Sequence, residues 1–180
     1  MRTLVHACCG PCSVYPADAL AAEGIEFRLF FFNPNIQPYR EFQRRLEAMK
    51  KFAELRDLPL IVDETYDLEG WLRRVAFREA NRCLICYRTR LEAAARLAKK
   101  SRFEAFTTTL LYSKQQPHEL VRELGEAVAE EVGVRFLYRD FRKGWRAGIQ
   151  TSKRMGLYRQ DYCGCVFSER DRFMGKPRGE

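Results

Sequence analysis

The seven cysteines of this 180-residue chain fall into three short groups, and none lies outside them. The groups are Cys8-Cys9-Gly-Pro-Cys12, Cys83-Leu-Ile-Cys86 and Cys163-Gly-Cys165. Cysteines that serve only as small hydrophobic side chains would be scattered through the core. Each group can instead bring two or three sulfur atoms close to one point. The groups are far apart in the sequence, so only the folded chain can gather them, and converging metal ligands are the chemistry that they indicate.

The number of thiols favours an iron–sulfur cluster over a single zinc ion. A tetrahedral zinc takes four ligands, and zinc sites prefer two to four residues between paired cysteines, whereas one glycine separates Cys163 from Cys165. A cluster uses four cysteines, which leaves three for a second metal beside it. Cys8 and Cys9 are adjacent, so they suit different metal atoms. All seven cysteines are therefore candidate metal ligands. The candidates for binding the cluster are Cys8, Cys9, Cys83 and Cys86.

Two other classes of protein would use the same residues. A zinc-stabilised RNA-binding module would use the thiols and the positive charge without catalysis. A thiol–disulfide oxidoreductase would use Cys9 and Cys12 without any metal, because a CxxC pair after a strand is typical of redox proteins. The second alternative leaves the four cysteines of the other two groups unexplained.

The composition predicts a soluble, cytoplasmic protein with no membrane partner. Apolar residues make up 46% of the chain and charged residues 31%, which is typical of a globular domain. No apolar run approaches the roughly 18 residues of a membrane span, and no signal sequence precedes the first cysteines. In the cytoplasm thiols stay reduced, and an odd number of cysteines argues against a complete disulfide framework.

The charge of the chain indicates a partner that carries phosphate groups. Lys and Arg number 32 against 24 acidic residues, which gives a net charge of +8. Such an excess is typical of nucleic-acid binding, although a well-solvated surface would look the same. The charge alone does not distinguish RNA, DNA and a small anionic substrate.

Segments with strand and helix patterns alternate about five times along the chain. The expected strands are 4–6, 27–32, 60–62, 105–111 and 134–138, and the expected helices are 18–23, 39–56, 68–80, 88–100 and 117–132. This alternation predicts a single α/β domain over residues 1–169, in which a parallel sheet of about five strands has helices on both faces. A loose basic tail is expected over 170–180.

The predicted sheet places the first cysteine group at the edge where folds of this type bind ligands. Ligands of such folds bind at the carboxyl ends of the strands, near a switch in strand order. Cys8 to Cys12 follow the first strand directly at this edge, and the other two groups must reach it from loops and helix starts. The chain has neither a G-x-x-x-x-G-K-[ST] loop nor a G-x-G-x-x-G fingerprint, so the sequence gives no support for nucleotide use.

Two further residues are candidates for catalysis. Asp140 follows the last expected strand and can ligate a metal, donate a proton or simply cap a turn. Tyr162 lies beside the third cysteine group, where aromatic and arginine side chains can stack on a splayed base. His6 lies inside the first strand and is expected to be a hydrogen-bonded core residue. Thr107 to Thr109 are consistent with ordinary β-branched strand residues.

Taken together, five blocks of this sequence resemble the QueH-type epoxyqueuosine reductases over about residues 3–170. The blocks are His6 to Ser13, Phe32 to Ile36, Cys83 to Cys86, Phe106 to Leu111 and Gln160 to Cys165. The resemblance implies a fold like that of the HUP superfamily (adenine nucleotide alpha-hydrolase-like), with cysteines in place of the phosphate loop. It also implies an oxidoreductase that reduces epoxyqueuosine in the anticodon of tRNA to queuosine, the last step of queuosine biosynthesis.

The resemblance further implies the cofactors and partners. They are a [4Fe-4S] cluster, an adjacent second metal ion for which iron is favoured, the tRNA and an external electron donor, without the cobalamin of the QueG enzymes. The best candidates for contact with tRNA phosphates lie on the basic face of the expected helix 39–56 and in the tail. The helix candidates are Arg40, Arg44, Arg45 and Lys50.

Overall fold

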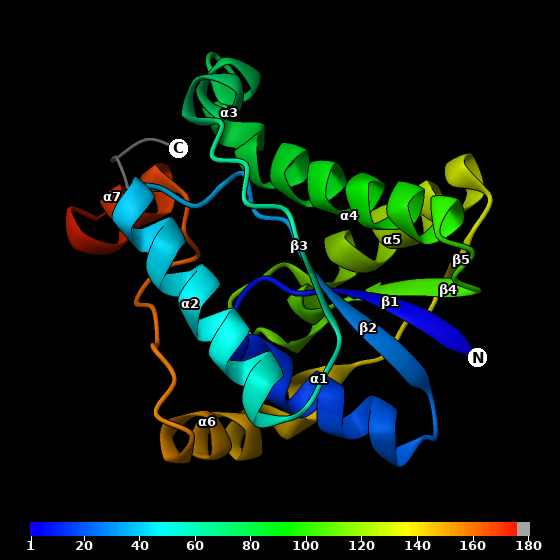
Figure 1. Ribbon diagram of the computed structural model, residues 1–180. Coiled ribbons are helices and arrows are strands. Elements are labelled where there is room, and N and C mark those ends of the chain that lie inside the picture. The colour runs from blue at the N-terminus through cyan, green and yellow to red at the C-terminus, as the bar shows by residue number, and fades with distance from the viewer. Residues whose placement is uncertain (176–180) are drawn as a thin grey trace.

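The computed structural model describes residues 1–175 and contains one parallel sheet of five strands in the order β3-β2-β1-β4-β5 (Figure 1). The strands are β1 (Arg2–His6), β2 (Glu26–Phe31), β3 (Leu60–Val62), β4 (Ala105–Thr108) and β5 (Arg135–Phe136). Because β1 lies between β2 and β4, the strand order switches direction beside β1. Ligand sites of doubly wound sheets lie at such a switch, at the carboxyl ends of the strands.

Helices cover both faces of the sheet. On one face, α1 packs against both α2 and α6, and on the other face α4 packs against α5 and against β1 and β4 (Figure 1). The bounds of these helices are α1 (Gly10–Ala22), α2 (Tyr39–Leu55), α4 (Arg82–Lys100), α5 (His118–Val132) and α6 (Trp145–Arg154). The predicted α/β fold with helices on both faces is confirmed, and it is consistent with a HUP-like domain.

The central strands are buried because helices cover them on both sides. In β1, Leu4 and Val5 are at most 1% exposed, and their neighbours Leu29 of β2 and Phe106 of β4 are buried to the same extent. Strands of this kind show continuous apolar runs rather than alternation.

None of the helices described is long and apolar enough to cross a membrane.

Helix α1 begins eight residues earlier than the sequence predicts, at Gly10 instead of Asp18. Two features explain the early start. Pro11 lies in the first turn, where its missing N–H costs no hydrogen bond. Gly10 lies so close to α2 that an added Cβ would be 2.5 Å from the carbonyl oxygen of Ala48. The early start places Cys12 on the first turn of α1.

Three shorter elements lie near the carboxyl edge of the sheet. They are α3 (Leu68–Val75), the 3-10 turn η1 (Glu79–Asn81) and α7 (Val166–Phe173). Helix α4 begins at Arg82, so Cys83 and Cys86 both lie on its first turns instead of preceding it.

The predicted loose tail does not begin at residue 170. Arg170 to Phe173 form the second half of α7, and Asp171 pairs with Arg82 of α4, which fastens this helix to the domain. Of the segment predicted as a tail, residues 176–180 lie outside the part of the chain that the structure describes.

Candidate metal centre

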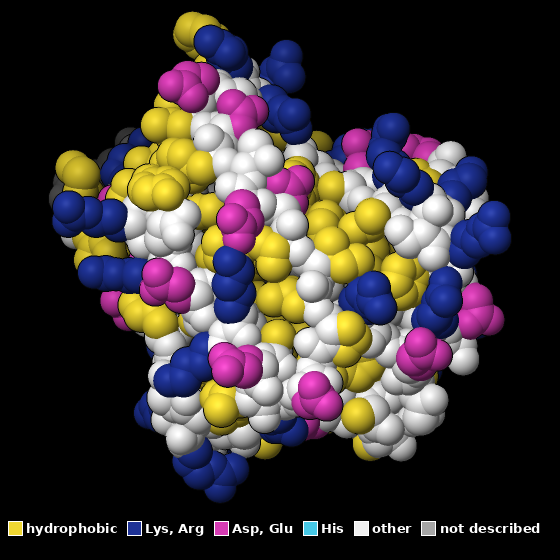
Figure 2. All heavy atoms as spheres, in the orientation of Figure 1, with side chains coloured by type: hydrophobic (Ala, Val, Ile, Leu, Met, Phe, Trp, Pro, Cys, Tyr) yellow, Lys and Arg dark blue, Asp and Glu magenta, His cyan; other side chains and the backbone are white. Residues whose placement is uncertain are grey.

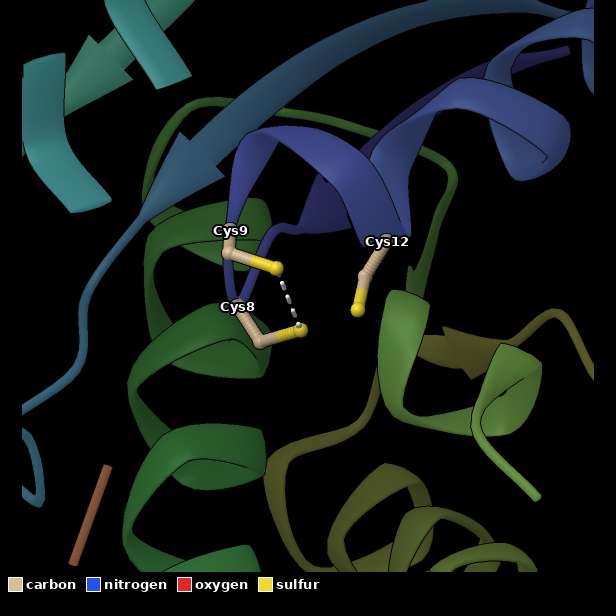
Figure 3. A group of neighbouring side chains, drawn as sticks. All are labelled: Cys8, Cys9 and Cys12. Atoms are coloured by element: carbon tan, nitrogen blue, oxygen red, sulfur yellow. Dashed lines mark hydrogen bonds between the residues drawn. The ribbon is translucent and has the colours of Figure 1, made fainter. Parts of the chain in front are cut away.

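The first cysteine group forms a cluster of three sulfur atoms at the carboxyl end of β1. The Sγ atoms of Cys8, Cys9 and Cys12 all lie within 4.8 Å of one another, and those of Cys8 and Cys9 are 3.9 Å apart. Figure 3 shows the three sulfur atoms pointing toward one another from the loop after β1 and the first turn of α1. Cys9 is 1% exposed and the other two are partly buried. Without a cation, this position brings three thiols together with little access to water.

Two side chains from distant parts of the sequence donate hydrogen bonds to these sulfur atoms. The hydroxyl of Thr109 donates to Sγ of Cys8 (3.3 Å) and accepts the backbone N–H of the same cysteine (3.0 Å). The amide of Gln160 donates to Sγ of Cys9 (2.9 Å) and lies 4.0 Å from Sγ of Cys12. The carbonyl oxygen of Gln160 is buried and has no partner among the described residues. Donors directed at sulfur stabilise thiolate, the form that binds metal.

Because the three thiols lie close together, the pKa values of Cys8 and Cys12 shift in opposite directions. Hydrogen bonds from Cys12 and Cys9 hold the pKa of the Cys8 thiol well below its usual value. The bond to Cys8 in turn raises the pKa of Cys12 well above its usual value, and burial adds to this effect. Of the three thiols, that of Cys8 is therefore the one whose thiolate form the metal-free site favours most. A thiophilic metal would neutralise all three, so the donor set fits a metal or an iron–sulfur cluster.

The other four cysteines, which make up the second and third groups of the sequence, gather where α4 meets the segment before α7. Cys86 and Cys165 are buried in one small hydrophobic cluster with Trp71 and Val75 of α3. Cys83 and Cys163 are exposed. Burial, helped by the negative charges that Cys163, Cys165 and Cys83 carry as thiolates, raises the pKa of Cys86 to about 12. The structure thus divides the seven thiols into three near β1 and four beside α3 and α4.

Arg90 lies between the two cysteine groups. This residue of α4 is 4% exposed, and its Nη2 donates to Sγ of Cys86 at 2.9 Å while its Nε donates to the carbonyl oxygen of the same residue at 3.2 Å. Its Nη1 lies 3.5 Å from Oδ1 of Asn33. The amide of Asn33 donates to the carbonyl oxygen of Ala7, directly before the first group (3.0 Å). Arg90 and Asn33 therefore connect the two groups through hydrogen bonds.

His6 is a core residue with a defined tautomer, as the sequence predicts. Its Nε2–H donates to the carbonyl oxygen of Phe32 (3.1 Å), so Nδ1 accepts the hydroxyl hydrogen of Thr108 (2.8 Å). The hydroxyl oxygen of Thr108 also accepts the N–H of Leu110 (3.2 Å). Burial and the charge of Arg90 lower the pKa of His6 to about 4. Thr108, the last residue of β4, and Thr109, directly after it, are therefore more than strand residues, because Thr108 holds His6 and Thr109 holds Cys8.

Arg45 was expected to contact tRNA, and the structure corrects this expectation. The side chain is 2% exposed and pairs with Glu41 (Nε to Oε1, 2.6 Å). Its guanidinium donates to the carbonyl oxygens of Cys163 (2.9 Å) and Tyr162 (3.0 Å). All its donors face the interior, so Arg45 positions the third cysteine group and is not available to a phosphate.

The close packing of Arg45 against this segment also requires the glycine between Cys163 and Cys165. Gly164 has a φ of +113°, which side-chain-bearing residues rarely adopt. An added Cβ would lie 2.9 Å from Cγ1 of Ile36 and 3.0 Å from Nη1 of Arg45. The short Cys-Gly-Cys spacing thus follows from a close approach of this segment to α2 and to the loop after β2.

The remaining basic candidates on α2 lie at the surface. Arg40 and Arg44 are exposed, and the guanidinium of Arg44 lies 5.7 Å from the ring centre of Tyr158. Lys50 is exposed and pairs with Glu64 (2.5 Å). Contacts of these three residues with tRNA stay a prediction.

The two candidate catalytic residues are engaged in local contacts. The hydroxyl of Tyr162 donates to the carbonyl oxygen of Gln37 (2.6 Å), and burial raises its pKa to about 12. Asp140 accepts the backbone N–H of Arg142 and pairs with its guanidinium (2.7 Å), which lowers the pKa of the carboxyl to about 2. Asp140 therefore caps the turn before η3 (Phe141–Gly144), as one of its sequence interpretations allowed, and its catalytic role stays untested.

Sequence reasoning did not identify Arg90 and Gln160 as residues that contact sulfur. Arg90 follows Cys86 by one helical turn, so its position on α4 was the available signal. Gln160 is separated from Cys9 by 151 residues, and no local pattern indicates that contact.

The fold and the site are those of a doubly wound α/β protein with clustered thiols at the carboxyl edge of its sheet. Other proteins with this type of sheet bind their ligands at that edge. The family model described as "Epoxyqueuosine reductase QueH" matches residues 3–171, and this chain belongs to that family. A protein of Dehalococcoides mccartyi with the same name is 38% identical over 98% of this chain and 96% of its own length. Proteins of that name from Histophilus somni and Thermotoga maritima are each 37% identical and cover 94% and 92% of this chain. The alignments span 73% and 88% of those two proteins.

Proposed function

We propose that this chain is an oxidoreductase that reduces the epoxide of epoxyqueuosine in tRNA to give queuosine. Membership of the QueH family supports the substrate and the reaction. The observation that carries the proposal is the group of three close sulfur atoms at the carboxyl end of β1, because it gives this α/β fold a site for metal-based redox chemistry.

The overall reaction converts an epoxide into an alkene and water, and it consumes two electrons and two protons. A [4Fe-4S] cluster held by four of the thiols would supply single electrons, and a second metal, iron by preference, would supply Lewis acidity to the epoxide oxygen. Cys8 and Cys9 of the first sequence group and Cys83 and Cys86 of the second remain the proposed cluster ligands. An external electron donor must reduce the enzyme, since each turnover consumes two electrons.

The side chains around the thiols have roles that follow from their contacts. Thr109, Gln160 and Arg90 each donate a hydrogen bond to a cysteine sulfur, which stabilises thiolates in a largely dry site. Arg142 lowers the pKa of the Asp140 carboxyl to about 2, which favours its ionised form and not the proton-donating form near neutral pH. Tyr162 remains a candidate proton donor beside the third cysteine group.

We further propose that the reaction needs no cobalamin. All seven cysteines are free, and their thiols form a donor set suited to iron and sulfide. A thiol–disulfide oxidoreductase would need only Cys9 and Cys12, and it would not need hydrogen-bond donors at the sulfur atoms of both groups.

The decisive experiment uses protein purified without oxygen. We expect brown protein that contains iron and acid-labile sulfide, and that converts epoxyqueuosine in tRNA to queuosine when dithionite is supplied without cobalamin. Mass spectrometry of the nucleosides measures this conversion. Colourless protein that contains zinc and binds RNA would indicate the RNA-binding module. Protein with neither metal, but with a reversible Cys9–Cys12 disulfide, would indicate the thiol–disulfide oxidoreductase.

A further inference from the structure

The turn between α3 and η1 exposes an aromatic side chain completely. Phe77 is 99% exposed, more than any other large hydrophobic residue that the structure describes. Isolated exposed apolar residues are common on protein surfaces, but a fully exposed phenylalanine ring at the tip of a turn is costly in water. This position therefore differs from an ordinary partly covered surface residue.

The backbone of this turn is ordered by hydrogen bonds, yet it does not suit phenylalanine. The N–H of Phe77 donates to a carboxylate oxygen of Glu79 (3.0 Å), and that of Arg78 donates to the carbonyl oxygen of Val75 (2.9 Å). Phe77 has a φ of +58°, in the left-handed region that favours glycine and asparagine. Neither burial nor backbone preference explains a phenylalanine here.

Three arginines surround this ring in the sequence and have no local partners. Arg73, Arg74 and Arg78 are exposed, and within residues 1–175 none of them forms an ion pair. Of the nearby acids, Asp67 and Glu79 accept backbone N–H groups, and Glu69, one turn before Arg73 on α3, forms no ion pair within residues 1–175. In Figure 2, the surface over α3 at the top of the molecule shows Lys and Arg side chains beside hydrophobic ones, with Asp and Glu side chains next to them. This combination leaves the cations available to an anionic partner.

The other side of α3 contacts cysteines of the candidate metal centre. Trp71 and Val75 are at most 2% exposed and pack with Cys86 of the second cysteine group and Cys165 of the third. Phe77 follows Val75 by two residues, so the turn is fixed beside this group. A substrate whose reacting part reaches the thiols would extend over this turn.

We propose that Phe77 stacks on an unpaired base of the RNA substrate while Arg73, Arg74 and Arg78 contact the flanking phosphates. This inference rests on the proposed function and adds a base-binding position to it. One ring among several guanidinium groups matches single-stranded RNA, in which bases with two open faces alternate with phosphates. The occupant is thus an anticodon loop, in which bases are unpaired.

The test measures the affinity of the anaerobic, iron-loaded protein for an unmodified anticodon stem–loop RNA by fluorescence anisotropy. We expect Phe77→Ala and Phe77→Leu to bind about 5- to 100-fold more weakly, because both remove stacking and only the leucine keeps apolar area. Phe77→Trp should retain the affinity of the wild type. Wild-type affinity in Phe77→Ala, or in Phe77→Leu, would overturn the proposal.

Phe77→Asn separates binding from folding. Asparagine tolerates a positive φ, so this variant should unfold at the same or a higher temperature than the wild type and still bind RNA weakly. The matched control for charge compares Arg73→Ala/Arg74→Ala with Arg96→Ala/Lys100→Ala, whose residues lie about 20–25 Å along α4 from Cys83. Only the first pair should weaken binding and reduce its salt dependence. Equal effects of the two pairs would overturn the proposed phosphate contacts.

The proposed function and this inference fail in different ways. Wild-type protein that never reduces epoxyqueuosine in tRNA contradicts the proposed function. Wild-type protein that does so, together with unchanged RNA affinity of Phe77→Ala, contradicts this inference alone. If Phe77→Ala lost turnover only with a protein reductant, and kept RNA affinity and dithionite-driven turnover, the turn would bind a protein electron donor, and the inference would be wrong.

Discussion

The guanidinium of Arg90 donates a hydrogen bond to the sulfur of Cys86, with 2.9 Å between Nη2 and Sγ, in the interior of the domain. The two residues are four apart on α4, so they lie on the same face of the helix. Arginine stays protonated in proteins, so this buried charge requires a partner. Burial raises the pKa of Cys86 to about 12, and the charge of Arg90 opposes that rise. Arg90 therefore favours the thiolate that a metal requires.

Replacing Arg90 should impair metal binding in steps. Arg90→Met removes the charge while filling much of the space, and we expect the iron content after anaerobic reconstitution to fall severalfold. Arg90→Lys keeps the charge but loses the contact with Asn33, so an intermediate iron content is expected. A charge-assisted hydrogen bond contributes about 1.5–3 kcal/mol, and the reduction potential of any remaining centre should shift. Iron content and potential equal to those of the wild type in Arg90→Met would contradict this role.

Gly164→Ala should disrupt the third cysteine group. The backbone there has a φ of +113°, and an added Cβ would lie 3.0 Å or less from atoms of Ile36 and Arg45. We expect a loss of about 2–3 kcal/mol in the free energy of unfolding, measured with urea, together with a loss of iron.

Gly24→Ala is the matched control for this change. Gly24 also has a positive φ, +66°, but an added Cβ would meet nothing within 4 Å. This variant isolates the backbone penalty of about 1 kcal/mol and should keep its iron. If both variants lost the same stability and the same iron, the close approach at Gly164 would have no special importance.

The parts of the fold that were predictable from the sequence are those with strong local patterns. The apolar runs around Val5 and Leu29 indicated buried parallel strands, and their alternation with helices gave the sheet its type. The start of α1 was not predictable, because Pro16 inside the helix usually marks a break, and the close approach of Gly10 to Ala48 is a tertiary contact.

The site was predictable in composition but not in arrangement. The spacing of Cys8, Cys9 and Cys12 was sufficient to indicate one ligand group. The interior position of Arg45 was not, because a basic helix face looks the same whether an arginine meets water or two backbone carbonyl groups. Its neighbour Glu41, one turn earlier, was the one local signal of an internal ion pair.

Arg44 and Arg45 are adjacent and should respond differently to substitution. Arg45→Ala leaves the carboxylate of Glu41 buried without its cation, so we expect a loss of about 3 kcal/mol in the free energy of unfolding and a loss of iron. Arg44 is exposed, so Arg44→Ala should change stability by less than about 0.5 kcal/mol. Urea unfolding and iron analysis distinguish the two residues.

Binding to tRNA provides the second comparison for α2. If Arg44 contacts a phosphate, Arg44→Glu should weaken binding and lower the slope of log K against log salt by about 1. Lys100→Glu, at the end of α4, is a control for the net charge. The assignment would be wrong if Arg44→Glu and Lys100→Glu changed the affinity equally.

The stability of the metal-free, reduced protein should fall as the solution becomes moderately acidic. Burial and Arg90 lower the pKa of His6 from 6.5 to about 4, and burial also lowers that of His118. The unfolded chain then binds protons below pH 6.5 while the folded chain does not. The stabilisation is complete above pH 6.5 and is lost as the pH falls toward 4.

Urea unfolding at pH 7 and pH 5 measures this loss, which we expect to be about 2 kcal/mol from His6, since one pKa unit corresponds to 1.36 kcal/mol. The carboxyl of Asp140, with a pKa of about 2, contributes only at lower pH. His6→Gln has no titrating group at this position, so its stability should vary less between the two pH values, although it is lower at pH 7. An equal pH dependence in His6→Gln and the wild type would show that His6 is not the group that titrates.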